Sequence, residues 1–138
     1  MKPIPIASIV DDDRIFVFGL SKLMEMISFT DELLVFLNGQ EALDYILPLA
    51  DTPEKLPDVI LLDINMPVLD GWQFMDEFVR LKPNINKQIT IYMVSSSVSE
   101  LDIKKAKAYS EISDYVVKPM RSEGLVKMQE KFNGEKIN

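Results

Sequence analysis

The sequence contains neither cysteine nor histidine. Without cysteine the chain has no disulfide, no thiol nucleophile and no cysteine-ligated zinc. Without histidine it has no Ser-His triad, no imidazole metal site and no histidine acid–base catalysis. Any catalysis therefore depends on carboxylates, hydroxyls, lysine, backbone amides or a bound metal.

Long apolar runs are missing as well. No run approaches the roughly 18 residues that span a bilayer, and the opening Met1-Lys-Pro-Ile-Pro-Ile6 lacks the pattern of a signal peptide. We therefore expect a cytoplasmic protein with no membrane partner. The net charge of −7 argues against a nucleic-acid surface, which needs clustered Lys and Arg. It suits a cation site, a basic partner or simple solubility.

Short apolar runs alternate with helical patterns along the 138 residues, a length that fits one domain. We expect strands at 6–10, 33–37, 59–62, 89–94 and 115–117. Apolar residues at helical spacing within 16–27, 43–50, 74–81 and 125–132 mark four helices, and a further helix is expected to begin near Ser97 and run to about Tyr109. Ser97 and Glu100 resemble a capping box at the start of the fourth helix, which has few large apolar residues and should be lightly anchored. This alternation predicts an α/β fold, a doubly wound parallel sheet with helices on both faces.

Polar residues follow four of the expected strands. They are Asp11, Asp12 and Asp13, then Asp63 and Asn65, then Ser95, Ser96 and Ser97, and finally Lys118. One such residue alone is more often a turn or cap residue, and we assign Asp13, Asp44 and Ser97 to caps or solvated surface. Ligands of parallel sheets sit outside the carboxyl ends of the strands. The joint occurrence after four strands therefore favours one functional site.

Several carboxylates at one sheet edge repel each other unless a cation lies between them. Mg²⁺ takes oxygen ligands and needs only one or two carboxylates together with waters and a phosphate oxygen. Asp12 and Asp63 as direct ligands, with Asp11 through water and the backbone carbonyl of Asn65, meet that demand.

An aspartate carboxylate is also a nucleophile toward phosphoryl groups and forms an acyl phosphate. The transferred group is stabilised mainly by charge and positioning. At this site Lys118 would supply a positive charge and Ser95 a hydroxyl donor.

The sequence resembles the CheY-like receiver domains of two-component response regulators over almost its whole length. The matching stretches are Ile9-Val-Asp-Asp-Asp13, Val59-Ile-Leu-Leu-Asp-Ile-Asn-Met-Pro-Val-Leu-Asp-Gly-Trp-Gln-Phe74, Met93-Val-Ser-Ser96 and Asp114-Tyr-Val-Val-Lys-Pro119. The second stretch is the most specific, because it carries the family pattern Asp-x-x-Met-Pro-x-x-Asp-Gly.

The resemblance implies one receiver domain over residues 1–138, with a core from about 5 to 133, no output domain and the flavodoxin-like strand order 2-1-3-4-5. It implies a role for each matched position. Asp63 is the phosphoacceptor; Asp11, Asp12, Asp63 and the Asn65 carbonyl hold Mg²⁺ or Mn²⁺; Lys118 precedes a cis bond to Pro119; Ser95 and Ser96 face the phosphoryl group; Ser95 and Tyr115 form the switch. Met66, Pro67, Asp70 and Gly71 shape the turn into the third helix.

The resemblance also implies the activity, that of a single-domain response regulator. The phosphoryl donor is a sensor histidine kinase or phosphotransfer protein, the reaction needs Mg²⁺, and the domain hydrolyses its own acyl phosphate. It is not a conventional enzyme, although it catalyses both steps on itself. A separate downstream protein reads the switch through the face of the fourth helix, fifth strand and fifth helix, and the positions of Asn65 and Ser97 tune how fast the acyl phosphate is lost.

Two other functions share parts of this pattern. A haloacid-dehalogenase-type phosphatase also places a nucleophilic Asp after a parallel strand, but it needs a second acid where this chain has Asn65. A flavodoxin-type module wants a phosphate-cradling loop after the first strand, where this chain has three aspartates. Within the receiver interpretation, the acidic pair is either Asp11 with Asp12 or Asp12 with Asp13, and the position directly after Val10 favours the first pair.

Overall fold

The computed structural model describes residues 1–137 and is built around a five-stranded parallel sheet in the order β2-β1-β3-β4-β5. The strands are β1 (Ile4–Val10), β2 (Thr30–Phe36), β3 (Val59–Leu62), β4 (Thr90–Ser95) and β5 (Ile112–Val117). The helices are α1 (Arg14–Ile27), α2 (Gly39–Ile46), α3 (Gly71–Leu81), α4 (Glu100–Lys107) and α5 (Ser122–Ile137), with short 3₁₀ turns at Leu47–Leu49, Pro53–Lys55 and Lys82–Asn84. The predicted fold class and strand order are confirmed.

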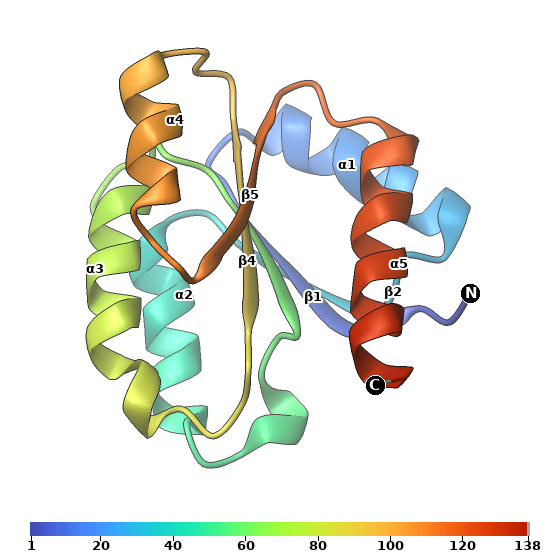
Figure 1. Ribbon diagram of the computed structural model, residues 1–138, viewed down its shortest axis with the longest axis horizontal. Helices are drawn as coiled ribbons and strands as arrows, with labels where there is room; N and C mark the ends of the chain where they lie inside the picture. Colours follow the sequence, from blue (N-terminus) through green and yellow to red (C-terminus); the bar gives the residue numbers. More distant parts are fainter. Residues whose placement is uncertain (138) are drawn as a thin grey trace.

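Helices cover both faces of the sheet (Figure 1): α2, α3 and α4 lie on one side, and α1 and α5 lie on the other. Each side has its own apolar core, one built around Phe74, Met75 and Ile91 and the other around Ile9, Phe29 and Leu125. The central strand β3 is buried along its whole length, as expected for a parallel strand covered on both faces.

Asp58 ties the amino ends of the strands together, at the edge opposite the polar residues. Its carboxylate accepts a hydrogen bond from the backbone N–H of Ile6 at 3.0 Å and pairs with Lys87, whose Nζ lies 3.1 Å from Oδ1. Lys87 also donates to the carbonyls of Pro53 and Leu56. Both charged side chains are largely buried, so this pair holds β1, β3 and the loop before β4 in place.

Three predicted boundaries are wrong in position. β2 begins at Thr30 and β5 at Ile112, earlier than expected, because polar residues in the first half of each edge strand (Thr30 to Glu32 in β2, Ser113 and Asp114 in β5) interrupt the apolar signal. The predicted cap of α4 is also wrong: Ser99 caps the helix, and its hydroxyl accepts the N–H of Leu101 at 3.2 Å. Ser97 instead donates to Asp102 at 2.7 Å.

α4 is lightly anchored, as predicted, because Ala106 is its only buried residue. The turn after it adds an aromatic contact, in which the ring of Tyr109 stacks on that of Trp72 with centroids 5.9 Å apart. The Tyr109 hydroxyl donates to Asp76 of α3 at 2.6 Å, and burial together with this contact raises the pKa of Tyr109 to about 12. Within residues 1–137, no helix is both long and apolar enough to cross a bilayer.

Candidate functional site at the carboxyl edge of the sheet

Carboxylates from the ends of two neighbouring strands meet at one edge of the sheet. Asp11 follows β1 and Asp63 follows β3; both are buried, while Asp12 beside them is exposed. One carboxylate oxygen from each of the three lies within 4.8 Å of the others. Asp13 turns away and caps α1 by accepting the N–H groups of Ile15 and Phe16. The carboxylate cluster of this structure therefore contains Asp11 and Asp12 but not Asp13, and the assignment of the metal-binding pair stays a prediction.

Lys118, directly after β5, reaches into this cluster. Its Nζ lies 2.8 Å from Oδ2 of Asp11 and 3.8 Å from Oδ2 of Asp63. Nζ also lies 4.1 Å from the centroid of the Phe16 ring. The peptide bond from Lys118 to Pro119 is cis, as expected. Phe16 was predicted only as part of an apolar helix stripe, so its contact with the lysine is new.

The Asp63 carboxylate experiences opposing influences. Burial raises the pKa of Asp63 from 3.8 to about 6, and the negative charges of Asp11 and Asp12 act in the same direction. The positive charge of Lys118 and a hydrogen bond from the backbone N–H of Ile64 lower this pKa, but their effect is smaller. Such an excess of negative charge is relieved when a cation binds. The cluster therefore fits a divalent metal, for which Asp11, Asp12 and Asp63 are oxygen ligands of the kind that Mg²⁺ and Mn²⁺ take.

The turn between β3 and α3 brings the backbone of α3 against Asp63. The N–H of Gly71 donates to the carbonyl of Ile64 at 2.8 Å, and a Cβ at Gly71 would lie only 2.3 Å from the carbonyl oxygen of Asp63. Asp70 and Gln73 form a capping box that starts α3 at this point. Glycine is therefore required here by close approach of two backbones, and Asp70 and Gly71 have the structural role predicted for them.

Ser95 lies at the buried end of β4, and its hydroxyl oxygen accepts the backbone N–H of Ser97 at 3.1 Å. The carbonyl of Ser97 in turn accepts a hydrogen bond from the hydroxyl of Tyr115 at 2.9 Å. Tyr115 is half-buried on β5. These bonds connect the hydroxyl of Ser95 to the tyrosine through one loop residue, Ser97.

Asn65 and Ser96 are exposed in the loops that follow β3 and β4, beside the acidic cluster in sequence. The metal contact of the Asn65 carbonyl and the phosphate contact of Ser96 stay predictions.

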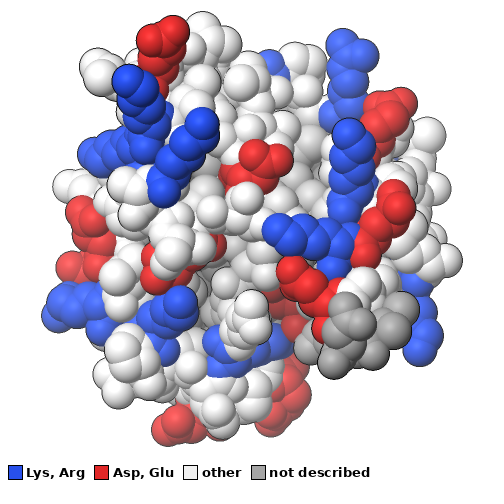
Figure 2. All heavy atoms as spheres, viewed as in Figure 1, with Lys and Arg blue, Asp and Glu red and all other residues white. Residues whose placement is uncertain are grey.

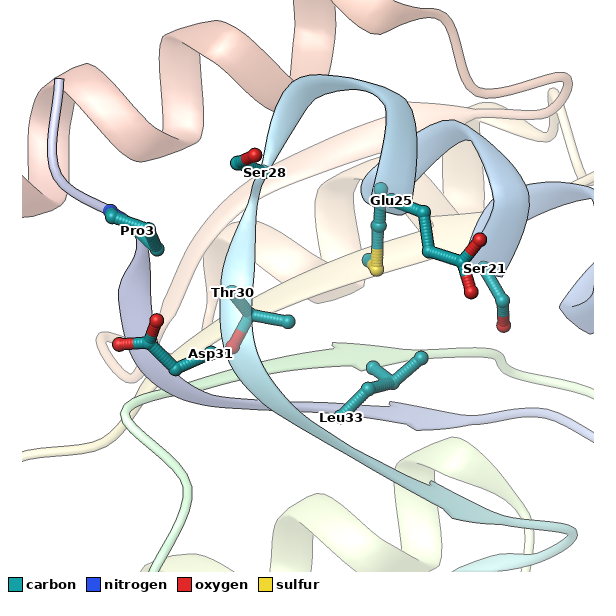
Figure 3. A pocket seen from close by; sticks show the side chains of 8 residues that line it. Pro3, Ser21, Glu25, Ser28, Thr30, Asp31 and Leu33 are labelled. Carbon is teal, nitrogen blue, oxygen red and sulfur yellow. The ribbon is translucent and has the colours of Figure 1, made fainter.

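A hollow of about 440 Å³ lies between α1 and β2, away from the carboxyl edge of the sheet (Figure 3). It is lined by Pro3, Ser21, Met24, Glu25, Ser28, Thr30, Asp31 and Leu33. The hydroxyls of Ser21 and Thr30 already donate to backbone carbonyls, each at 2.7 Å. The carboxylates and the lysine converge at the carboxyl edge, so the chemistry belongs there.

A five-stranded parallel sheet in this order, with an acidic cluster and a lysine at its carboxyl edge, defines the CheY-like class of α/β proteins. The family model described as "Response regulator receiver domain" matches residues 7–130. The chain therefore belongs to the receiver domain family of two-component response regulators.

Individual relatives agree with this assignment. A two-component response regulator from Cytophaga hutchinsonii has a TM-score of 0.87 at 26% identity, over 96% of this chain and 99% of that one. The Mn²⁺-bound form of the response regulator Rcp1 has a TM-score of 0.68 at 20% identity, over 94% of this chain and 91% of that one. The sensor histidine kinase CheAY of Helicobacter pylori is 36% identical over 71% of this chain, which spans 12% of that kinase.

Proposed function

We propose that this chain is a response regulator that accepts a phosphoryl group on Asp63 in a Mg²⁺-dependent reaction. The observation that supports this most is the cluster of Asp11, Asp12 and Asp63 within 4.8 Å, with Lys118 beside it. Asp63 has one oxygen committed to the N–H of Ile64, while the other faces the lysine. That second oxygen is the nucleophile.

The proposed reaction moves phosphorus from nitrogen to oxygen. An oxygen of Asp63 forms a bond to the phosphorus of a phosphohistidine as the P–N bond breaks, and the departing imidazole keeps the electron pair and takes a proton from solvent. Lys118 contributes a positive charge to the transferred group and Ser95 a hydroxyl donor. Asp11, Asp12, Asp63 and the Asn65 carbonyl would hold Mg²⁺, which would supply further positive charge beside the phosphoryl oxygens. Hydrolysis reverses the modification: water attacks the phosphorus, the bond from phosphorus to the Asp63 oxygen breaks, and the carboxylate and inorganic phosphate are released.

The proposed donor is a sensor histidine kinase or a phosphotransfer protein, since receiver domains interact with such proteins. The added phosphoryl group brings about −1.5 to −2 charges to the edge where Ser95 lies. Because Ser95 is linked through Ser97 to Tyr115, a shift of the serine toward the phosphoryl group changes the surroundings of the tyrosine. This connection is the proposed switch.

A separate downstream protein would read the switch through the face of α4, β5 and α5. Lys and Arg side chains gather over α4 and along α5 on the face that Figure 2 shows, and Lys104, Lys105 and Lys107 lie in the last turn of α4. Between α4 and β5 is a hollow of about 290 Å³ lined in part by Ile103, Ala106, Tyr115 and Val117. These lysines suit a partner with acidic side chains. We propose that the protein works in the cytoplasm and that its phosphorylated form is recognised there by this separate protein.

Labelling with a small phosphodonor tests the proposal. Incubation with acetyl phosphate and Mg²⁺ should add one acid-stable, base-labile phosphoryl group to the wild-type protein and none to Asp63→Asn. Asp44→Asn is the matched control, because Asp44 is an exposed carboxylate on α2 whose partner is Gln40. Labelling of Asp63→Asn at the wild-type level would refute the assignment of the nucleophile.

A further inference from the structure

The ammonium group of Lys118 has two kinds of neighbour. The first are carboxylate oxygens, with Asp11 at 2.8 Å and Asp63 at 3.8 Å. The second is the Phe16 ring, whose centroid lies 4.1 Å from Nζ. The lysine side chain is only 14% exposed, so the ring takes the place of much of the water that would otherwise solvate the charge. A charge over an aromatic face is attracted by the ring quadrupole, and the attraction increases as water is removed.

Phe16 itself is fixed in place. Its backbone N–H donates to the side chain of Asp13 at 3.1 Å, which makes it part of the first turn of α1. Its half-buried ring packs against the core on the α1 and α5 side of the sheet. The ring is therefore a rigid surface next to a flexible side chain, since a lysine stem has many accessible rotamers.

We infer that Phe16 is a positioning residue for phosphorylation of Asp63, because its aromatic face holds the Lys118 ammonium beside the oxygen that accepts the phosphoryl group. This inference rests on the proposed function. Without the ring, the nearest attraction for Lys118 is Asp11, and a mobile ammonium spends less time where the transferred group needs its charge. An aliphatic side chain at position 16 fills similar space but has no negative face to offer the cation.

The experiment separates the aromatic face from simple packing. The rate constant for phosphorylation by acetyl phosphate is measured at saturating Mg²⁺ for the wild type, Phe16→Leu and Phe16→Tyr. We expect Phe16→Leu to be about three- to thirty-fold slower, the range that corresponds to a partly desolvated cation–π contact. Phe16→Tyr should restore most of the rate, because its ring has a similar negative face.

A series of phenylalanines with one, two and three ring fluorines at position 16 removes the remaining ambiguity. Each fluorine withdraws electron density from the face of the ring while leaving the shape of the ring nearly unchanged. The logarithm of the phosphorylation rate constant should therefore fall steadily with the number of fluorines. Mg²⁺ affinity should change less than about twofold across the series, since the acidic ligands are untouched.

Phe18→Leu is the matched control. Phe18 lies on the same helix, is exposed and has Lys22 5.5 Å from its ring centroid, but that lysine does not contact the acidic cluster. Its rate should equal that of the wild type. A flat fluorine series, or a Phe16→Leu protein as fast as wild type, would overturn the inference while leaving the phosphoacceptor assignment intact. A wild-type protein that takes no label at all would instead refute the proposed function.

Discussion

Lys118 lies closer to Asp11 than to Asp63, with Nζ–Oδ2 distances of 2.8 and 3.8 Å. The lysine therefore neutralises part of the charge that would otherwise attract a dication. A metal ion bound at the proposed site would therefore compete with the ammonium group for the same carboxylates.

Replacing Lys118 with methionine should consequently separate metal binding from phosphorylation. We expect Lys118→Met to bind Mg²⁺ about three- to tenfold more tightly, because a positive charge next to the ligands is removed. Its labelling by acetyl phosphate should be slower, because the transferred group loses a positive contact. Calorimetric titration measures the first effect, and a fall in Mg²⁺ affinity would contradict the competition.

The raised pKa of Asp63 predicts a particular dependence of stability on pH. The folded protein binds this proton with a pKa of about 6 and the unfolded chain with one near 3.8. Between these values the folded state carries more protons, so the Asp63 contribution to stability falls as pH rises through that window. The shift of about two units corresponds to about 3 kcal/mol at most.

Asp63→Asn should accordingly gain stability relative to the wild type as pH increases from 4 to 7 in metal-free buffer. Millimolar Mg²⁺ should reduce this difference at pH 7, since it compensates the ionised carboxylate of the wild type. Urea unfolding of both proteins at several pH values measures the effect. A stability difference that is independent of pH would argue against a raised pKa.

Substitution of Gly71 should lower both the stability of the protein and its rate of labelling by acetyl phosphate. A Cβ added there would lie 2.3 Å from the carbonyl oxygen of Asp63, so Gly71→Ala must move the backbone that presents the nucleophile. We expect a cost of about 1–3 kcal/mol and slower labelling. Gly19→Ala on α1 is the control: a Cβ there has no neighbour within 4 Å, and the change should stabilise the helix by about 0.5–1 kcal/mol. Equal effects of the two substitutions would be inconsistent with this structure.

The ion pair at the opposite edge predicts a stability effect without an effect on chemistry. Lys87→Met leaves the buried carboxylate of Asp58 unpaired and should cost about 3–5 kcal/mol. Lys22→Met removes the exposed pair with Glu25 and should cost less than about 1 kcal/mol. Below the unfolding transition, both variants should be labelled at the wild-type rate. Thermal unfolding followed by circular dichroism compares the two.

The sequence predicts the fold well because each apolar run of the sheet stops at a polar residue. Val10 is followed by Asp11 and Leu62 by Asp63, so both the strand ends and the acidic cluster can be located from sequence alone. The first residues of β2 and β5 could not be located from the sequence, because polar residues on an edge strand give no apolar pattern.

Contacts that depend on how elements pack lie beyond sequence patterns. The stripe that includes Phe16 predicts a core residue, whereas the rotation of α1 buries Val17, Leu20 and Met24 and leaves Phe16 at the margin, facing Lys118. The spacing of Ser97 and Glu100 predicts a cap at Ser97, but the backbone course of the loop places Ser99 at the cap position.

The most direct test of the account is to identify the phosphorylated residue. After treatment with acetyl phosphate and Mg²⁺, borohydride reduces an aspartyl phosphate to homoserine, which mass spectrometry can place in the sequence. We expect homoserine at position 63, and none when Mg²⁺ is chelated. Homoserine at another aspartate, or equal yield at position 63 without metal, would contradict it.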